Sequence, residues 1–332
     1  MRESLLRYLV CPRDHAELSL SADTRDGDRI ATGTLRCSAC QAEYPIRHYV
    51  PRFVADDQYV ASFSHEWTRF ARTQLDSVNG TDISLQYFRN SVKRAPADYA
   101  GSLVLDAGCG TGRMLELFAD VEATVIGIDL SYAVDSAVDN VGKHPHLHVV
   151  QASIYDLPFR PATFDFAYSI GVLHHTPDPE RAFRAVQDVV RPGGDVGIRV
   201  LSKRMVGGVN LDWIFPLFLY RHVTRRARPD HLLAFLKGYV PVACSLRRIP
   251  LVGQFFRWLL PVADYHGVHP LDDEQLRQWN ILDTFDRFSP RYYFRYSDAD
   301  LRAWFPSDRF DHFERGTFPV SARGRRASAS RT

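Results

Sequence analysis

The chain has 332 residues, of which 45% are hydrophobic, and its formal net charge is +2 at pH 7. That length suits one large domain or two modest ones, and so small a net charge disfavours a protein that binds nucleic acid chiefly through its phosphates. No apolar run approaches the ~20 residues of a membrane-spanning helix, and the first apolar run is too short for a secretory signal. We therefore expect a cytoplasmic protein, and its five cysteines are too few for a disulfide framework.

Composition divides the chain into five parts, which we expect to form an α/β fold with added elements. Short apolar runs alternate with amphipathic segments in the third part, as is typical of a parallel sheet with helices on its faces. The parts are a small β-ribbon (1–55), a helical lead-in (56–100), a sheet domain (101–202 and 291–325), a helical insertion after the fifth strand (203–290) and a disordered tail (326–332).

The N-terminal part contains three of the five cysteines. Cys37 and Cys40 form a C-x-x-C knuckle, and Cys11 opens a second knuckle in which Asp14 and His15 stand where another cysteine is expected. A structural zinc site takes four ligands from two such knuckles. The sequence therefore allows two interpretations: a zinc ribbon completed by the aspartate or the histidine, or a metal-free ribbon that keeps its shape by packing.

A glycine-rich loop lies in "VLDAGCGTGR" (104–113), between an expected strand and a helix that we expect to begin at Gly112. Such a turn lets the backbone approach a ligand closely, next to the unpaired N–H groups of a helix N-terminus. The loop lacks the lysine of a nucleotide-triphosphate loop, and its G-x-G-x-G spacing is not the G-x-G-x-x-G of dinucleotide enzymes. Asp129 ends the next expected strand, where an acid can accept hydrogen bonds from a ribose.

The loop and three later segments resemble, in order and spacing, the motifs of class I S-adenosylmethionine-dependent methyltransferases. The later segments are "ASIYDLPF" (152–159), "FDFAYSIGVLHHTPDPERAF" (164–183) and "VRPGG" (190–194). The resemblance implies a Rossmann-like seven-stranded sheet and S-adenosyl-L-methionine as the cofactor. The N-terminal part is similar to the small zinc-ribbon-like proteins that accompany such domains, which implies a structural Zn²⁺.

The same resemblance implies which residues bind the cofactor. Asp106 and the glycine loop would hold the methionine end, and Asp129 the ribose. The full set is Asp106, Gly108, Cys109, Gly110, Gly112 and Arg113 around the loop, Asp129 and Leu130 at the ribose and adenine, Ser153 and Ile154 beside the adenine, and Ile170 and Gly171 beneath the sulfonium. Phe63, Trp67 and Phe70 are similar to aromatic residues that close over the cofactor in a bacterial subgroup; otherwise they are core residues.

Two segments supply candidate catalytic residues. His174 and His175 follow the fourth expected strand, and an imidazole that titrates near neutrality suits a general base, although the pair could instead support the loop. The second segment, "LDTFDRFSPRYYF" (282–294), resembles one found in uncharacterised bacterial methyltransferases. Its candidates are Asp283, Asp286 and Tyr292, which either bind the acceptor or form a polar network that anchors the insertion.

The predicted function is methylation of an oxygen or nitrogen atom of a small molecule or glycan precursor, with the insertion lying over the substrate or against a membrane surface. One alternative is an RNA methyltransferase, because a zinc ribbon ahead of this domain also resembles ribosomal guanine methyltransferases. The small net charge and the segment "SIGVLHH", which replaces an N-P-P-Y-type motif, disfavour nucleic acid. A non-catalytic, cofactor-binding regulator is a third hypothesis, which the intact motifs disfavour.

Overall fold

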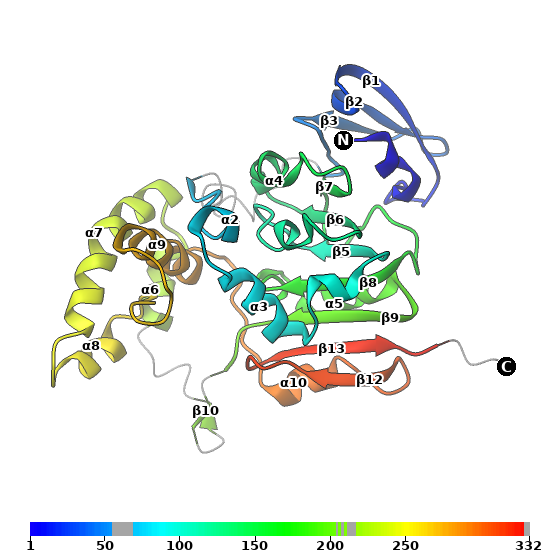
Figure 1. Cartoon of the computed structure of the whole chain (residues 1–332). Coiled ribbons are helices and arrows are strands. Elements are labelled where there is room, and N and C mark those ends of the chain that lie inside the picture. The colour runs from blue at the N-terminus through cyan, green and yellow to red at the C-terminus, as the bar shows by residue number, and fades with distance from the viewer. Residues whose placement is uncertain (55–68, 204, 207–208, 211–216, 329–332) are drawn as a thin grey trace.

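The computed structural model describes residues 1–54, 69–203, 205–206, 209–210 and 217–328. In this part of the chain, a small N-terminal sheet lies beyond one edge of a larger central sheet, and a group of helices lies to one side (Figure 1). The predicted lid residues Phe63 and Trp67 lie outside the described residues. Among the helices described, none combines the length and the apolar character needed to cross a bilayer.

The N-terminal part is a four-stranded antiparallel ribbon, as predicted. It begins with a 3-10 helix, η1 (Glu3–Tyr8), and its strands are β1 (Leu18–Asp26), β2 (Arg29–Cys37), β3 (Glu43–Arg47) and β4 (Val50–Pro51), in that order. After β4 the chain joins the central sheet: Arg52 forms a parallel bridge with Gln151, and its Nη1 donates to Gln151 Oε1 over 2.7 Å. The ribbon is thereby attached at one edge of the central sheet.

The central sheet confirms the predicted seven-stranded, Rossmann-like architecture. Among the described residues its strands lie in the order β12 (Phe310–Arg315), β13 (Ser321–Arg326), β9 (Val190–Arg199), β8 (Phe164–Ile170), β5 (Leu103–Ala107), β6 (Thr124–Asp129) and β7 (Leu147–Gln151). The five strands from β9 to β7 are parallel, and β13 runs antiparallel to β9. Their continuous apolar runs fit strands that are covered on both faces. The predicted tail starts at the last residue of β13, and 329–332 lie outside the described part.

Helices α3 (Ile83–Val92), α4 (Ala133–Val141), α5 (Pro179–Asp188) and α10 (Asp298–Ala303) pack against this sheet. As predicted, Asp178 caps α5 by accepting a hydrogen bond from the Arg181 amide, and Pro179 occupies the first turn. The prediction of a helix starting at Gly112 is wrong. Gly112 has φ +88°, which is incompatible with a right-handed first turn, so only a short 3-10 helix, η3 (Leu115–Phe118), follows the loop.

The lead-in and the insertion contain mostly helices in their described parts. The lead-in forms α2 (Asp76–Asn79), α3 and η2 (Pro96–Tyr99), and the insertion forms the strand pair β10 (Met205–Val206) and β11 (Val209–Asn210) followed by α6 (Leu217–Thr224), α7 (Pro229–Arg247), α8 (Gly253–Leu259) and α9 (Asp273–Phe288). The long helices share a separate apolar core, which includes Leu236, Leu282 and Phe285. Figure 1 shows these helices on one side of the sheet, with α9 turned toward it.

Candidate cofactor and acceptor site

A cavity of about 540 Å³ lies where four parallel strands end. Gly108 follows β5, Asp129 ends β6, Ile170 ends β8 and Arg199 ends β9, and all four residues line it. Ligands of open α/β sheets bind at this edge because the strand ends and the loops after them converge there. The opposite wall comes from α9 and the segment before it, including Tyr265 and Trp279, so the insertion faces the glycine loop across the cavity.

The glycine loop adopts a backbone conformation that only glycine accepts readily. Gly108, Gly110 and Gly112 have φ values of +97°, +52° and +88°. A Cβ atom on Gly108 would lie 2.4 Å from Cγ2 of Val172, so the loop and the segment after β8 are in closer contact than any side chain allows. The backbone of the first two glycines therefore lines the cavity directly.

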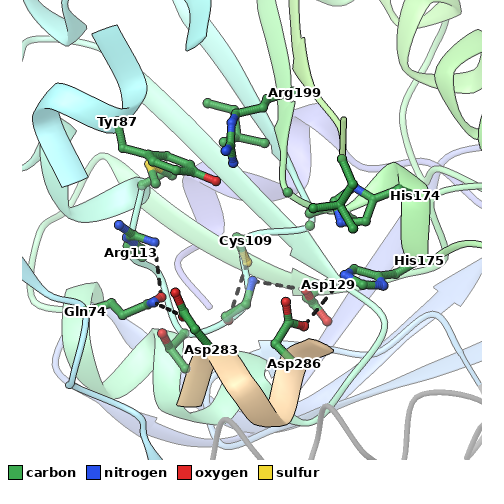
Figure 2. Close-up of a pocket in the computed structure, with 18 of the residues that line it drawn as sticks. Gln74, Tyr87, Cys109, Arg113, Asp129, His174, His175, Arg199, Asp283 and Asp286 are labelled. Atoms are coloured by element: carbon green, nitrogen blue, oxygen red, sulfur yellow. Dashed lines mark hydrogen bonds and ion pairs between the residues drawn. The ribbon is translucent and has the colours of Figure 1, made fainter. Parts of the chain in front are cut away.

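Asp129 is held at the end of β6 by hydrogen bonds from its neighbours. Its Oδ2 accepts from the Gly110 amide over 3.0 Å, and its Oδ1 accepts from the amide and hydroxyl of Ser131 over 2.8 and 2.6 Å. Burial raises the pKa of this carboxyl, while these hydrogen bonds act in the opposite direction. The carboxyl faces the cavity (Figure 2) and keeps acceptor capacity, since it accepts three hydrogen bonds and offers about four lone-pair sites, which fits a ribose hydroxyl.

Asp106 lies beneath the loop rather than in the cavity wall. It is only 2% exposed, and its Oδ2 has no hydrogen-bond partner among the described residues. Burial raises the pKa of Asp106 to about 8, the Tyr168 hydroxyl lowers it and the charge of Asp129 raises it further. A ligand ammonium group close to the loop would favour the charged carboxylate, so this orphaned oxygen fits the methionine end of S-adenosylmethionine.

Most of the other predicted cofactor residues line the same cavity. They are Cys109, Arg113, Leu130, Ile154, Ile170 and Gly171. Two predicted residues lie elsewhere. A Cβ on Gly112 would contact Ala137 and Val141, so this position faces α4, and the Ser153 hydroxyl accepts a hydrogen bond from the Tyr155 amide within its own turn. Phe70, the one lid candidate described, is buried in the core of the insertion helices.

His174 and His175 both reach the cavity, from the short 3-10 helix η4 (Leu173–His175). Burial, and secondarily the charge of His175, lower the pKa of His174 well below its usual range, which disfavours its imidazolium form. His175 Nδ1 lies 3.1 Å from the Tyr292 carbonyl oxygen, and its Nε2 lies 3.6 Å from Asp286 Oδ1. A carbonyl can only accept, so Nδ1 carries the proton in the neutral ring and Nε2 keeps its lone pair.

The two predicted aspartates of α9, Asp283 and Asp286, line the cavity. Tyr292 does not line it but offers its carbonyl to His175, and the neighbouring Tyr293 lines the cavity instead. Asp283 accepts a hydrogen bond from Gln74 Nε2 over 3.0 Å and another from the Tyr265 hydroxyl. Gln74 in turn accepts from Arg113 Nη1 over 3.2 Å. This chain of contacts joins the glycine loop, the lead-in and α9, which agrees with a polar network that anchors the insertion.

The sequence did not predict several residues that line the part of the cavity away from the glycine loop, which we call the acceptor side. The main ones are Tyr87, Arg199 and Phe318. They come from α3, the end of β9 and the segment before β13, so no local pattern brings them together. One signal was available: an arginine in "DVGIRVL", at the carboxyl end of an otherwise apolar buried strand, is unusual and indicates a functional position.

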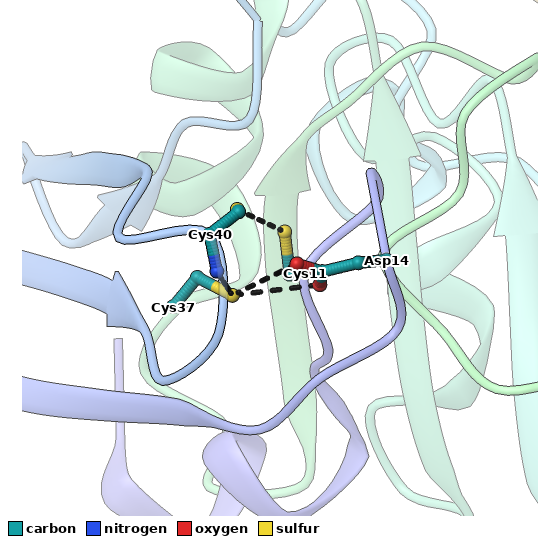
Figure 3. Close-up of side chains that lie close together, drawn as sticks. All are labelled: Cys11, Asp14, Cys37 and Cys40. Carbon is teal, nitrogen blue, oxygen red and sulfur yellow. Dashed lines mark hydrogen bonds between the residues drawn. The ribbon is translucent and has the colours of Figure 1, made fainter.

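The ribbon brings together a second group of side chains (Figure 3). Cys11, Asp14, Cys37 and Cys40 each offer one ligand atom, and these atoms lie within 4.8 Å of one another. Cys11 Sγ is 3.6 Å from Cys40 Sγ, and Cys37 Sγ is 3.4 Å from Asp14 Oδ1. His15 is not in the group. Three thiols and one carboxylate fit a closed tetrahedral Zn²⁺ site, so the aspartate is the candidate fourth ligand.

We expect about one equivalent of zinc per purified chain by metal analysis, because a closed site of this donor set binds zinc tightly. Cys40 is exposed, so Cys40→Ser should remove zinc without opening a core cavity. Ser38→Ala, in the same turn, is the control and should keep the metal. Less than about 0.2 equivalents in the unmodified protein would identify a metal-free ribbon instead.

Comparison with known families agrees with this site. A family described as a methyltransferase domain matches residues 105–198. The ubiquinone biosynthesis O-methyltransferase of Paraburkholderia phymatum is 34% identical over 172 residues, which cover 48% of this chain and 74% of that protein. The tRNA (carboxymethyluridine(34)-5-O)-methyltransferase of Arabidopsis thaliana is 38% identical over 104 residues, which cover 30% of this chain and 24% of that protein.

Other relatives match over a smaller share of their length. The chain spans about a quarter of several curated relatives that it matches. A solved S-adenosylmethionine-dependent methyltransferase from Mesorhizobium loti is 30% identical over 30% of this chain and 46% of its own, with a TM-score of 0.28. The region that the family matches, 105–198, includes the glycine loop and Asp129.

Proposed function

Because this chain belongs to the class I S-adenosylmethionine-dependent methyltransferases, we propose that it methylates an oxygen or nitrogen atom of a small molecule or glycan precursor. When bound, the cofactor supplies an activated methyl group on a sulfonium. The chain's own task is then to hold the acceptor in line with that methyl group and to remove its proton.

The observation that carries this proposal is the wall opposite the glycine loop. One cavity of about 540 Å³ is lined both by the loop and by Tyr265, Trp279 and Asp283 of the insertion. Since the cofactor occupies part of that space, the remainder suits a small acceptor enclosed by side chains. Such a wall excludes water from the reacting groups, which strengthens the electrostatic interactions between them.

Asp129 would hold the ribose, and the backbone of Gly108 and Gly110, with Asp106 beneath it, would hold the methionine end. The role of Asp129 rests on its remaining acceptor capacity, and that of Gly108 on a contact with Val172 that leaves no room for a side chain. The role of Asp106 rests on a buried carboxyl oxygen that has no hydrogen-bond partner among the described residues. Ile170 and Gly171, at the end of β8, form the floor between cofactor and acceptor.

We assign the general base to His175. Its Nε2 lies 3.6 Å from Asp286 Oδ1, so the imidazolium formed when His175 takes a proton from an acceptor hydroxyl or amine would pair with that carboxylate. His174 is less suited because its burial opposes the positive charge that a base acquires. Asp283 is less suited because Gln74 and Tyr265 already donate hydrogen bonds to its carboxylate.

An RNA acceptor is the second candidate, since one relative is named a tRNA methyltransferase, whereas another is named a ubiquinone biosynthesis O-methyltransferase. Purified protein and methyl-labelled S-adenosylmethionine, offered separately to small-molecule, lipid and RNA fractions of its host, discriminate between them. We expect label in the small-molecule fraction. Label in RNA alone would overturn the proposed acceptor class, and Asp129→Ala serves as the background control.

A further inference from the structure

We propose that the acceptor carries an anionic group, a carboxylate or a phosphate, and that Arg199 binds this group between the rings of Tyr87 and Phe318. This inference rests on the proposed function, because it names the substrate class of the same site. These three residues lie outside the region that the family matches, 105–198, and Arg199 is the first residue after it.

Arg199 is a cation in contact with two aromatic rings, and within the described part of the chain the carboxyl charge that acts on it is that of Asp283. Its Cζ lies 4.3 Å from the ring centre of Tyr87 and 4.9 Å from that of Phe318. Its Nε is buried and has no hydrogen-bond partner among the described residues. Burial lowers the pKa of Arg199 to about 10, so the side chain is still a cation at neutral pH. A guanidinium in a cavity wall that has a buried, unused N–H donor is typical of an anion site.

The formal charges of the arginines and carboxyl groups on this side of the cavity sum to a positive excess. On the acceptor side the cavity is lined by three arginines, Arg113, Arg199 and Arg287, and by two carboxyl groups, Asp283 and Asp286. The first carboxyl accepts from Gln74 and Tyr265, and the second lies beside His175. Counted formally, these groups leave one positive charge and a sulfonium cofactor adds a second, so an anionic acceptor would reduce the positive excess of the site.

Arg199 is also close to the floor on which the methyl group would lie. Its carbonyl accepts a hydrogen bond from the Gly171 amide over 3.0 Å, and a Cβ on Gly171 would be 4.0 Å from the Tyr87 hydroxyl. Figure 2 shows Arg199 and Tyr87 on one side of the cavity and the two histidines on another. An acceptor anchored at Arg199 can therefore present a second group to His175.

A binding test decides the site without knowledge of the acceptor. The probe is benzoate, with neutral benzamide as its isostere, added to protein saturated with S-adenosylhomocysteine. We expect benzoate, but not benzamide, to raise the melting temperature, and Arg199→Gln to abolish the difference. Arg191→Gln, the same change at the exposed end of the same strand, is the control and should keep it. Equal shifts with both probes, or an unchanged difference in Arg199→Gln, would overturn the proposal.

A product test then identifies the source of the charge. Labelled small-molecule product should be retained by an anion exchanger at pH 7, and release after phosphatase treatment would identify a phosphate rather than a carboxylate. For Arg199→Gln we expect the KM for this acceptor to rise about 30-fold or more, and for Arg199→Lys we expect an intermediate rise. The affinity for S-adenosylhomocysteine should not change in either variant. A neutral or cationic labelled product would overturn the inference, whereas an absence of labelled small molecule would overturn the proposed function only.

Discussion

Gly108→Ala should weaken cofactor binding by on the order of 100-fold while leaving a folded, less stable protein. The new Cβ would lie 2.4 Å from Val172 Cγ2, and alanine is disfavoured at φ +97°. The loop must shift to relieve this contact, and a displacement of about 1 Å can cost on the order of 100-fold in a site of this kind. Calorimetry with S-adenosylhomocysteine measures the affinity, and thermal melting measures the loss of stability.

Gly101→Ala is the matched control for this change. Gly101 also has a positive φ, +76°, but no atom lies within 4 Å of the position of its Cβ. Backbone strain alone should therefore lower the unfolding free energy of the control by about 1 to 2 kcal/mol, and its cofactor affinity should not change. Equal losses of affinity in both variants would show that backbone strain, rather than close contact with Val172, explains the effect.

His175→Gln should lower kcat by about 10²- to 10⁴-fold, the usual contribution of a positioned general base. Cofactor affinity should not change, because His175 faces the acceptor side and contacts the Tyr292 carbonyl and Asp286. The measurement uses the host fraction that accepts label, with initial rates at saturating cofactor. Asp286→Asn should give a smaller loss, since it removes only the charge that stabilises the imidazolium.

His174→Gln is the comparison that separates the two histidines. Both side chains are buried in the same wall and their ring centres are 4.1 Å apart, so the two substitutions disturb packing similarly. A larger fall in kcat for His174→Gln than for His175→Gln would assign the base to His174. Similar small effects in both would support the alternative in which the pair only supports the loop.

The sequence by itself determined the features that depend on local backbone geometry and periodicity. Apolar runs of strand length, the capping of α5 by Asp178 and the glycine spacing of the loop all act over a few residues. The cysteine knuckles also predicted the ribbon, but not which side chain completes the metal group. That choice depended on the turn after Cys11, which brings Asp14, and not His15, beside the three thiols.

Only the tertiary structure decided how the acceptor side is assembled. Arg199, Tyr87 and Phe318 come from three distant segments, and His175 meets Asp286 only because α9 packs over the ends of the strands. No periodic pattern encodes these contacts, because each arises from packing between elements whose order in space differs from their order in the chain. The sequence therefore predicted the residues that we propose hold the cofactor, because they act over short segments, and the packing of the insertion determined which charged side chains line the rest of the cavity.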